Sequence, residues 1–291
     1  MTRRLENKVA IVTGAGTGIG EAIAHKFAKE GAKVVVCGLQ SDPIDDVARA
    51  IQQSGGTAIP YSDDVAEESY AKGCIEATIK AFGKLDILVN NAGVYLTNAE
   101  IDQYPIEDFD RTMRNNTRSM FLMTKFAIPY LQKTNGNIVN AGSEAGFNGQ
   151  PMNDVYGGTK GWVHAFTKGV AVEQAKYGIR ANCVCPGAID TAWTHKETGP
   201  MDRQMEQMLI QGTPMARRGT PEEMANVYAF LASNEASYVT GALWLADGGV
   251  TVAKGPVGQQ TPFWKRGEPE GELKLEHSKD GLENKEVHQI K

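Results

Sequence analysis

Apolar runs alternate with amphipathic stretches along most of the chain. Short runs rich in β-branched residues predict strands, and apolar residues repeated every three or four positions predict helices. Strands are expected at 8–13, 33–37, 58–61, 86–89, 137–141, 179–185 and 242–246. Helices are expected between them, at 21–29, 42–54, 66–82, 105–133, 154–177, 201–211 and 220–233. This alternation predicts an α/β fold with one doubly wound parallel sheet and right-handed crossovers.

The helix expected at 105–133 carries a polar residue in its middle. Its candidate buried positions are Phe109, Met113, Met120, Phe121 and Phe126. Asn116 lies among them, and an Asn side chain within a helix competes for backbone hydrogen bonds. We expect either a local kink at Asn116 or a side chain that faces solvent.

A glycine-rich segment connects the first predicted strand to the first predicted helix. Gly14, Gly18 and Gly20 follow the spacing Gly-x-x-x-Gly-x-Gly, which departs from the Gly-x-Gly-x-x-Gly dinucleotide pattern because Ile19 replaces a glycine. Glycines let the backbone approach a diphosphate, and a helix N-terminus offers free N–H groups. The segment favours a nucleotide-binding loop, with a plain tight turn as the alternative. Residues 90–93 follow another strand, at the edge where ligands bind in such sheets.

Tyr156 and Lys160 lie four positions apart in the helix expected at 154–177, and therefore on one face of it. A free phenol has a pKa of about 10, and a neighbouring ammonium group lowers it. Ser143, thirteen residues before Tyr156, could hydrogen-bond an oxygen that is formed or consumed. This arrangement suits the interconversion of a carbinol and a carbonyl, although Tyr-x-x-x-Lys also occurs by chance on many helices.

Composition and charge narrow the class of partner. The chain has 291 residues, of which 41% are hydrophobic and 22% charged, and its net charge is -5. No basic stripe is available to displace counterions from phosphates, so we expect a small-molecule partner and no nucleic acid. No run approaches the roughly 18 apolar residues of a membrane span, and no secretion signal precedes the first strand. We expect a cytoplasmic protein without a membrane partner.

The four cysteines are scattered along the sequence. Cys183 and Cys185 would share one face of a short strand. We interpret them as small buried hydrophobic residues and expect no metal, because no His or further Cys lies near them in the sequence. Reduced thiols agree with a cytoplasmic protein.

Taken in sequence order, these motifs resemble the classical short-chain dehydrogenase/reductase family over residues 6–252. The resemblance rests on the segment 13–20, residues 90–93, Asn116, Ser143, Tyr156 with Lys160, and Pro186-Gly187. It implies a single Rossmann-type domain with three α/β/α layers. It also implies hydride transfer between a nicotinamide cofactor and a substrate carbon.

The resemblance assigns a role to each candidate site residue. Tyr156 would be the acid/base and Ser143 would polarise the substrate oxygen. Lys160 would bind the nicotinamide ribose and lower the pKa of Tyr156, and Asn116 would hold a proton-relay water. The implied cofactor contacts are Gly14, Thr17, Gly18, Ile19, Gly20, Leu39, Asp64, Val65, Asn90, Ala92, Gly93, Tyr156, Lys160, Pro186, Gly187, Ile189 and Thr191. Many members are tetramers built through the two long helices, so we expect a homotetramer.

The choice of cofactor depends on the end of the second strand. NAD-using members commonly carry an Asp there, and this chain has Gly38. NADP-using members often carry a basic residue next to it or in the glycine segment, and this chain has Leu39 and Thr17. A 2′-phosphate needs a cation, and none lies between Lys33 and Arg49. The sequence favours NAD and leaves NADP open.

The substrate is predicted only by class. Gly142 replaces a Ser that usually precedes the catalytic Ser143, which removes bulk beside the substrate or is a harmless loop variant. The candidate substrate contacts are Glu144, Asn153, Trp193 and His195. Polar contacts would suit a sugar, cyclitol or diol, because an apolar ligand would leave them unpaired.

Two other functions remain as alternatives. One is an NADP-dependent carbonyl or 3-oxoacyl reductase, and the other is a non-catalytic dinucleotide-binding sensor or scaffold. The polar extension at 253–291 is expected to be disordered. An ordered segment between subunits, held by Phe263 and Trp264, is the alternative.

Overall fold

The computed structural model describes residues 3–191 and 203–255. Their strands form one sheet in which every pairing is parallel. The strand order is β3-β2-β1-β4-β5-β6-β7. After β1 the chain adds β2 and β3 on one side of it, then crosses to the other side and adds β4 to β7 in order. The strands are β1 (Val9–Thr13), β2 (Lys33–Gly38), β3 (Thr57–Ser62), β4 (Ile87–Asn90), β5 (Asn137–Ala141), β6 (Arg180–Pro186) and β7 (Leu243–Ala246). The predicted doubly wound α/β sheet is confirmed.

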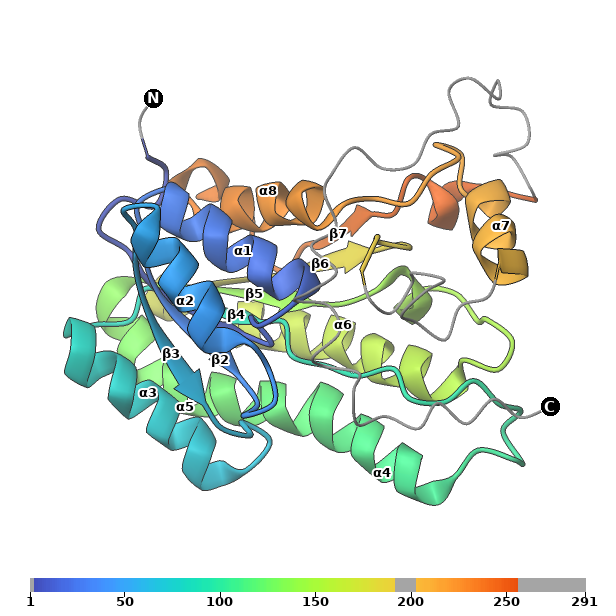
Figure 1. The fold of residues 1–291 in the computed structure, drawn as a ribbon, viewed down its shortest axis with the longest axis horizontal. Helices are drawn as coiled ribbons and strands as arrows, with labels where there is room; N and C mark the ends of the chain where they lie inside the picture. The colour runs from blue at the N-terminus through green and yellow to red at the C-terminus, as the bar shows by residue number, and fades with distance from the viewer. Residues whose placement is uncertain (1–2, 192–202, 256–291) are drawn as a thin grey trace.

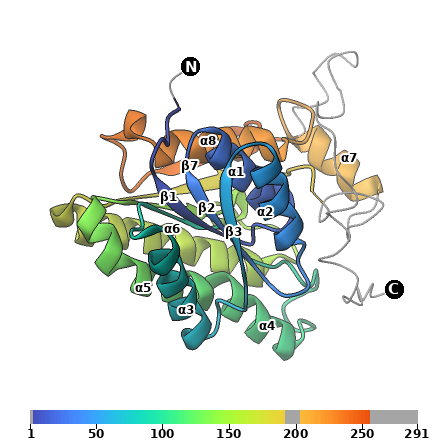
Figure 2. The same ribbon diagram turned by 60° about the vertical axis from the view of Figure 1, so that its left-hand side comes forward.

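Helices cover both faces of this sheet (Figures 1 and 2). One face carries α1 (Gly18–Lys29), α2 (Ile44–Gln53) and α8 (Pro221–Ala232). The other carries α3 (Glu68–Phe82), α5 (Ser119–Thr134) and α6 (Asp154–Gln174). Two shorter helices are α4 (Ile106–Met113), which leads into α5, and α7 (Arg203–Gly212). These are the three layers of a Rossmann-type fold.

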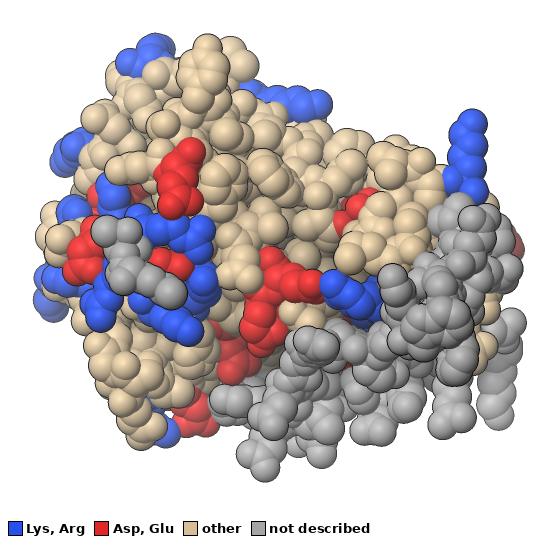
Figure 3. Space-filling view, turned by 90° about the horizontal axis from the view of Figure 1, so that it is seen from above, with Lys and Arg blue, Asp and Glu red and all other residues tan. Residues whose placement is uncertain are grey.

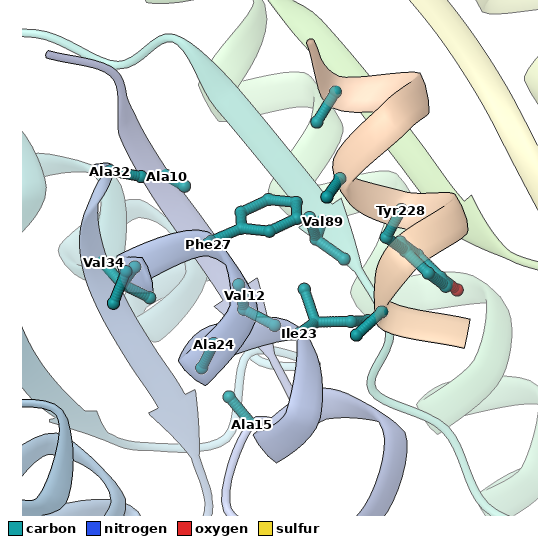
Figure 4. Close-up of a cluster of buried hydrophobic side chains, with 14 of the residues drawn as sticks. Ala10, Val12, Ala15, Ile23, Ala24, Phe27, Ala32, Val34, Val89 and Tyr228 are labelled. Atoms are coloured by element: carbon teal, nitrogen blue, oxygen red, sulfur yellow. The ribbon is translucent and has the colours of Figure 1, made fainter. Parts of the chain in front are cut away.

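Each face of the sheet has its own apolar core. Successive strand residues point to opposite faces, so Val12 of β1 lies in the core under α1 and Ile11 lies in the core over α3 and α5. In Figure 4, Phe27 and Ile23 of α1 lie among Val12 and Val89 of the sheet, with Tyr228 of α8 beside them. Full burial of a side chain such as Phe27 contributes about 1.5–3 kcal/mol, which fixes α1 behind the glycine segment.

The start of α8 is set by a capping box. The hydroxyl of Thr220 accepts from the N–H of Glu223 at 3.1 Å, and a carboxylate oxygen of Glu223 accepts from the N–H of Thr220 at 2.9 Å. Pro221 occupies the first turn, where its missing N–H costs nothing. Such a cap stabilises a helix by about 1 kcal/mol.

The helix expected at 105–133 is interrupted at Asn116. A π-helical segment, Arg114–Arg118, separates α4 from α5. Asn116 is buried, and its side chain binds the main chain of Val94 through Oδ1 (2.7 Å) and Nδ2 (2.9 Å). The solvent-facing alternative is therefore wrong, and the irregularity at Asn116 is a π-turn, while a kink there stays a prediction. Residues of a π-bulge often mark a functional position.

The interruption also changes which side chains are buried in this chain. Met120 is buried as expected, whereas Phe109 and Phe121 are 44% and 46% exposed, so their predicted burial is wrong. A π-turn contains one residue more than an α-turn, so it rotates every later side chain around the helix relative to the earlier ones. An α-helical period continued through the π-turn therefore assigns later residues to the wrong face of the helix. Met113 and Phe126 are half-buried.

Within the described residues, no helix combines the length and the apolar character that crossing a membrane requires.

On the face over α1 and α8, acidic side chains lie among the basic ones (Figure 3). Arg4 and Lys26 both pair with Glu30 there, at 2.8 and 3.1 Å.

Residues 256–291, including Phe263 and Trp264, lie outside the described residues, so the expectations for this extension stay predictions.

Candidate active site

A cavity of about 460 Å³ opens at the carboxyl ends of the central strands. Parallel strands bring their carboxyl ends to one edge, which is why segments far apart in sequence meet there. All the predicted cofactor contacts line this cavity except Gly20 and Asn90, and Ser143 lines it as well. The sequence motifs therefore converge on one site.

The glycine segment forms the end of the cavity nearest β1. Gly14 and Gly18 have φ angles of 59° and 56°, in the left-handed region that side chains disfavour. A Cβ atom on Gly14 would lie 2.9 Å from Cα of Ala92, and one on Gly20 would lie 2.0 Å from the carbonyl oxygen of Gly14. Gly14 thus allows two loops to approach closely, and Gly20 allows α1 to pack on the loop rather than lining the cavity.

Two side chains join the ends of β1 and β4. The hydroxyl of Thr13 accepts from the N–H groups of Asn91 and Ala92, each at 3.0 Å. The side-chain amide of Asn91 donates to the carbonyls of Thr13 and Gly14 at 3.2 and 3.1 Å. Asn91 was not predicted as a site residue, although its position after a buried strand and before Ala92-Gly93 was a usable signal.

Asn90 points away from this end of the cavity. Its Nδ2 donates to Thr124 of α5 at 3.1 Å and to Asn140 of β5 at 2.9 Å, within the buried layer below the sheet. Its side chain therefore ties β4 to β5 and α5. A contact between Asn90 and a cofactor stays a prediction.

Three of the predicted catalytic residues, Ser143, Tyr156 and Lys160, line the other end of the cavity, and Asn116 is buried outside its lining. Tyr156 and Lys160 lie one turn apart on α6, with Nζ of Lys160 5.4 Å from the centre of the Tyr156 ring. Ser143 follows β5 and lies close enough to Tyr156 to act on its pKa. Nζ of Lys160 donates to the carbonyl of Ala141 at 2.9 Å. Asn116 reaches the same helix by donating to Thr159 at 3.2 Å.

Burial controls the protonation of this group. Burial raises the pKa of Tyr156 to about 12, although the hydrogen bond from Ser143 acts to lower it. Burial also lowers the pKa of Lys160 to about 8, because the protein interior disfavours its charged form. The expectation that Lys160 lowers the pKa of Tyr156 is not met in the chain alone, where desolvation is the largest influence on both groups.

A second aromatic ring and a polar chain border the catalytic residues. The ring of Tyr95 packs edge-on against Tyr156, with centroids 5.1 Å apart, and this residue was not predicted. Gln150 donates to the Glu144 carboxylate at 2.7 Å and accepts from Asn153 at 2.7 Å. Glu144 and Asn153 thus belong to one hydrogen-bonded chain beside Ser143, outside the residues that line the cavity.

Trp193 and His195, the other two predicted substrate contacts, lie outside the described residues.

Asp42 is a further residue that the sequence did not identify. Its carboxylate accepts from the N–H of Leu39 at 2.8 Å, just beyond β2, and it lines the cavity. Cβ atoms on Gly38 and Gly16 would lie 2.8 Å from Asp42 atoms. An acidic group is therefore present at the end of β2, supplied from four residues downstream of Gly38 through a tight turn.

The residues present fit a dinucleotide. The left-handed glycines Gly14 and Gly18 leave backbone exposed to a phosphate group beside the N-terminus of α1. Tyr228 of α8 lines the cavity, and its buried hydroxyl has no hydrogen-bond partner among the described residues. A buried unpaired hydroxyl costs about 1–3 kcal/mol, which a bound polar ligand would recover.

The fold and this site define a dinucleotide-binding oxidoreductase with a tyrosine and lysine at its centre. A family model described as enoyl-(acyl carrier protein) reductase matches residues 14–251. The chain belongs to the classical short-chain dehydrogenase/reductase family, whose members use nicotinamide dinucleotides.

Three relatives show the range of this similarity. The chain is 36% identical to a 3-oxoacyl-(acyl-carrier-protein) reductase of Thermotoga maritima, over 86% of this chain and 100% of the relative. It is 37% identical to glucose 1-dehydrogenase 2 of Bacillus subtilis, over 87% of this chain and 98% of the relative. It is 35% identical to L-fucose dehydrogenase of Bos taurus, over 90% of this chain and 96% of the relative.

Proposed function

We propose that this oxidoreductase is an NAD-dependent dehydrogenase that interconverts a secondary alcohol and a ketone. The proposal rests on one observation: Ser143, Tyr156 and Lys160 line the same cavity, with Nζ of Lys160 5.4 Å from the centre of the Tyr156 ring. A substrate oxygen that meets both hydroxyls can be oriented by one and exchange a proton with the other.

Each of the four residues has a separate task. Tyr156 holds the proton that moves to or from the substrate oxygen, and Ser143 donates a hydrogen bond to that oxygen. Lys160 places a positive charge beside the phenol, and Asn116 fixes the loop at Val94 against α6. The nicotinamide, when bound, supplies the hydride acceptor or donor and, in its oxidised form, a positive charge.

NAD is favoured over NADP by the charges near β2. Asp42, Asp63 and Asp64 line this part of the cavity, and Asp42 is fixed by the N–H of Leu39. Asp64 is paired with Arg114 at 2.7 Å, so Asp42 and Asp63 are the carboxylates that would repel a 2′-phosphate, whereas a carboxylate accepts hydrogen bonds from ribose hydroxyls. Arg111, another residue of the cavity wall, lies 3.8 Å from the carboxylate of Asp108.

The proposed substrate is a polyhydroxylated compound such as a sugar, cyclitol or diol. Glu144, Gln150 and Asn153 form a hydrogen-bonded chain beside Ser143, just outside the residues that line the cavity, where a bound substrate could exchange partners with it. The names of two relatives, glucose 1-dehydrogenase 2 and L-fucose dehydrogenase, agree with this class. The 3-oxoacyl-(acyl-carrier-protein) reductase relative favours a second candidate, the reduction of a 3-oxoacyl thioester.

A homotetramer is proposed from the exposed apolar side chains on the helices that family members use for assembly. Phe109 on α4, Phe121 on α5 and Val172 on α6 are 44%, 46% and 81% exposed in the single chain. Light scattering on the purified protein should give four times the chain mass of 31.5 kDa. A monomeric mass would contradict this assembly.

The activity is tested by following absorbance of the reduced cofactor at mildly alkaline pH. NAD and NADP are supplied in parallel with sugars, cyclitols, diols and simple secondary alcohols, and a 3-oxoacyl thioester is tested in the reductive direction. We expect reduction of NAD by a polyol. Oxidation of NADPH by the thioester alone would support the second candidate and contradict the first.

A further inference from the structure

A second cluster of reactive side chains lies directly behind the catalytic residues. His164 of α6 and Cys183 and Cys185 of β6 are buried, and their Nε2 and Sγ atoms all lie within 4.8 Å of one another. Among residues 3–191 and 203–255, this is the one group of three or more His, Cys, Asp or Glu side chains close enough to hold a metal ion. The sequence suggested no metal because no His lies near the two cysteines, and α6 supplies one from 21 residues before Cys185.

The separations within this cluster match those between zinc ligands. Sγ of Cys183 lies 3.7 Å from Sγ of Cys185, and Sγ of Cys185 lies 3.3 Å from Nε2 of His164. Zinc binds thiolate sulfur at about 2.3 Å and imidazole nitrogen at about 2.0 Å. In a tetrahedron these bond lengths place two sulfurs about 3.8 Å apart and a sulfur and a nitrogen about 3.5 Å apart. Two of the three separations thus match tetrahedral spacing, and Sγ of Cys183 lies within 4.8 Å of Nε2 of His164.

Gly142 leaves the centre of the cluster open. A Cβ atom on residue 142 would lie 2.6 Å from Sγ of Cys183, 2.9 Å from Nε2 of His164 and 3.0 Å from Sγ of Cys185. That point is farther from each donor than a zinc–ligand bond, and it marks the edge of the open space rather than the position of an ion. A side chain at position 142 would crowd all three donor atoms.

The position of the imidazole is fixed by its surroundings. The ring of Phe147 packs against His164 with centroids 4.5 Å apart. A Cβ atom on Gly146 would lie 2.5 Å from Cε1 of His164, so a glycine at this position makes room for the ring.

The charge of the site also suits a divalent ion. Two thiolates neutralise one Zn²⁺, and a neutral group can be buried at a far lower cost than an isolated ion. The ligands form a soft set of sulfur and nitrogen, which favours zinc over magnesium or calcium. Three protein ligands with one open position also occur in known zinc sites.

We propose that His164, Cys183 and Cys185 form a buried Zn²⁺ site, which the absence of a side chain at Gly142 leaves uncrowded. Binding forms two Zn–S bonds and one Zn–N bond and releases the two thiol protons to solvent, so no oxidant or reductant takes part. The site does not depend on the proposed substrate or on the choice of cofactor.

Cobalt titration of the untagged full-length chain tests the site. The protein is treated with a chelator, kept reduced with a phosphine, and titrated anaerobically with Co²⁺. We expect one Co²⁺ per chain, with the near-ultraviolet thiolate-to-cobalt band and the visible bands of a tetrahedral ion. Added Zn²⁺ should remove these bands, and elemental analysis should then find one zinc per chain.

Four variants decide which residues bind the ion. Cys185→Ser and His164→Gln should weaken cobalt binding at least about tenfold. Gly142→Ser keeps all three ligands and should abolish binding by crowding their donor atoms. Cys74→Ala removes another buried cysteine, outside the cluster, and should leave binding unchanged.

Two results would overturn the proposal. One is the absence of tetrahedral cobalt bands in the unaltered chain. The other is their persistence in Gly142→Ser or His164→Gln protein whose circular dichroism matches that of the unaltered chain. Because metal content is measured directly, failure of the dehydrogenase assay would not affect the outcome.

Discussion

The two ends of the cavity are built from different parts of the chain. The end at β1 is made largely by backbone: Gly14 and Gly18 adopt left-handed conformations, and Thr13 holds two N–H groups of the loop after β4. The other end is made by side chains, and the pKa values of Tyr156 and Lys160 there are shifted by burial. Substitutions that alter the backbone conformation should therefore impair the end at β1. Substitutions that alter a charge or remove a proton should impair the end at Tyr156 and Lys160.

The largest effect is expected from Tyr156→Phe, which removes the proton donor and keeps the ring. General acid/base catalysis contributes about 10²–10⁴-fold, so kcat should fall by this factor. Cofactor affinity, measured by quenching of protein fluorescence with NADH, should change less than about threefold because the glycine segment is untouched. Retained turnover would show that another group moves the proton.

Lys160→Met should alter how stability depends on pH. The folded-state pKa of Lys160 is about 8, below its ordinary value, so the folded chain loses this proton before the unfolded chain does. The buried ammonium therefore destabilises the fold below pH 8, and this penalty disappears as the pH rises toward about 10.4. The free energy of unfolding of the unaltered chain, relative to Lys160→Met, should rise by roughly 3 kcal/mol between pH 7 and 10.5.

Urea denaturation of both proteins at several pH values measures this difference. Titrating groups common to both proteins, such as the buried cysteines, cancel in the comparison. A difference that does not vary with pH would mean that the lysine is solvated in the native chain.

Gly14→Ala tests the backbone end. The substitution forces a left-handed residue, at about 1–2 kcal/mol, and places Cβ 2.9 Å from Cα of Ala92. The cofactor Kd should rise about 5–30-fold and the Tm should fall. The control is Gly149→Ala, because a Cβ atom there meets nothing within 4 Å. Equal effects of the two substitutions would contradict a specific role for Gly14.

Asp42→Asn is expected to have the smallest effect. The amide oxygen can still accept from the N–H of Leu39, while the negative charge beside β2 is lost. The ratio of kcat/KM for NAD to that for NADP should fall about tenfold, which is about 1.4 kcal/mol. Asp45→Asn, on the exposed surface of α2, is the control and should leave the ratio unchanged.

Local patterns in the sequence predicted most of the fold. The seven strands are found where β-branched runs occur, and the π-helical segment Arg114–Arg118 occurs where Asn116 interrupts the helix. The burial of Phe109 and Phe121 was predicted wrongly because an α-helical period was extended through that segment. Tyr156, Lys160, Ser143 and Asn116 were identifiable because their spacing is a motif, and the fold does bring them together.

The sequence by itself determined the strands, the glycine segment and the candidates for the catalytic side chains, since each depends on residues close together in the chain. Tertiary structure decided that Asp42 turns back toward Gly38, that Asn90 points into the core, and that burial outweighs charge at Tyr156. It also placed His164 against Cys185, on an element that the sequence does not connect to it. Such contacts depend on how helices pack across the sheet, and the solvation that sets a pKa depends on everything that surrounds the group.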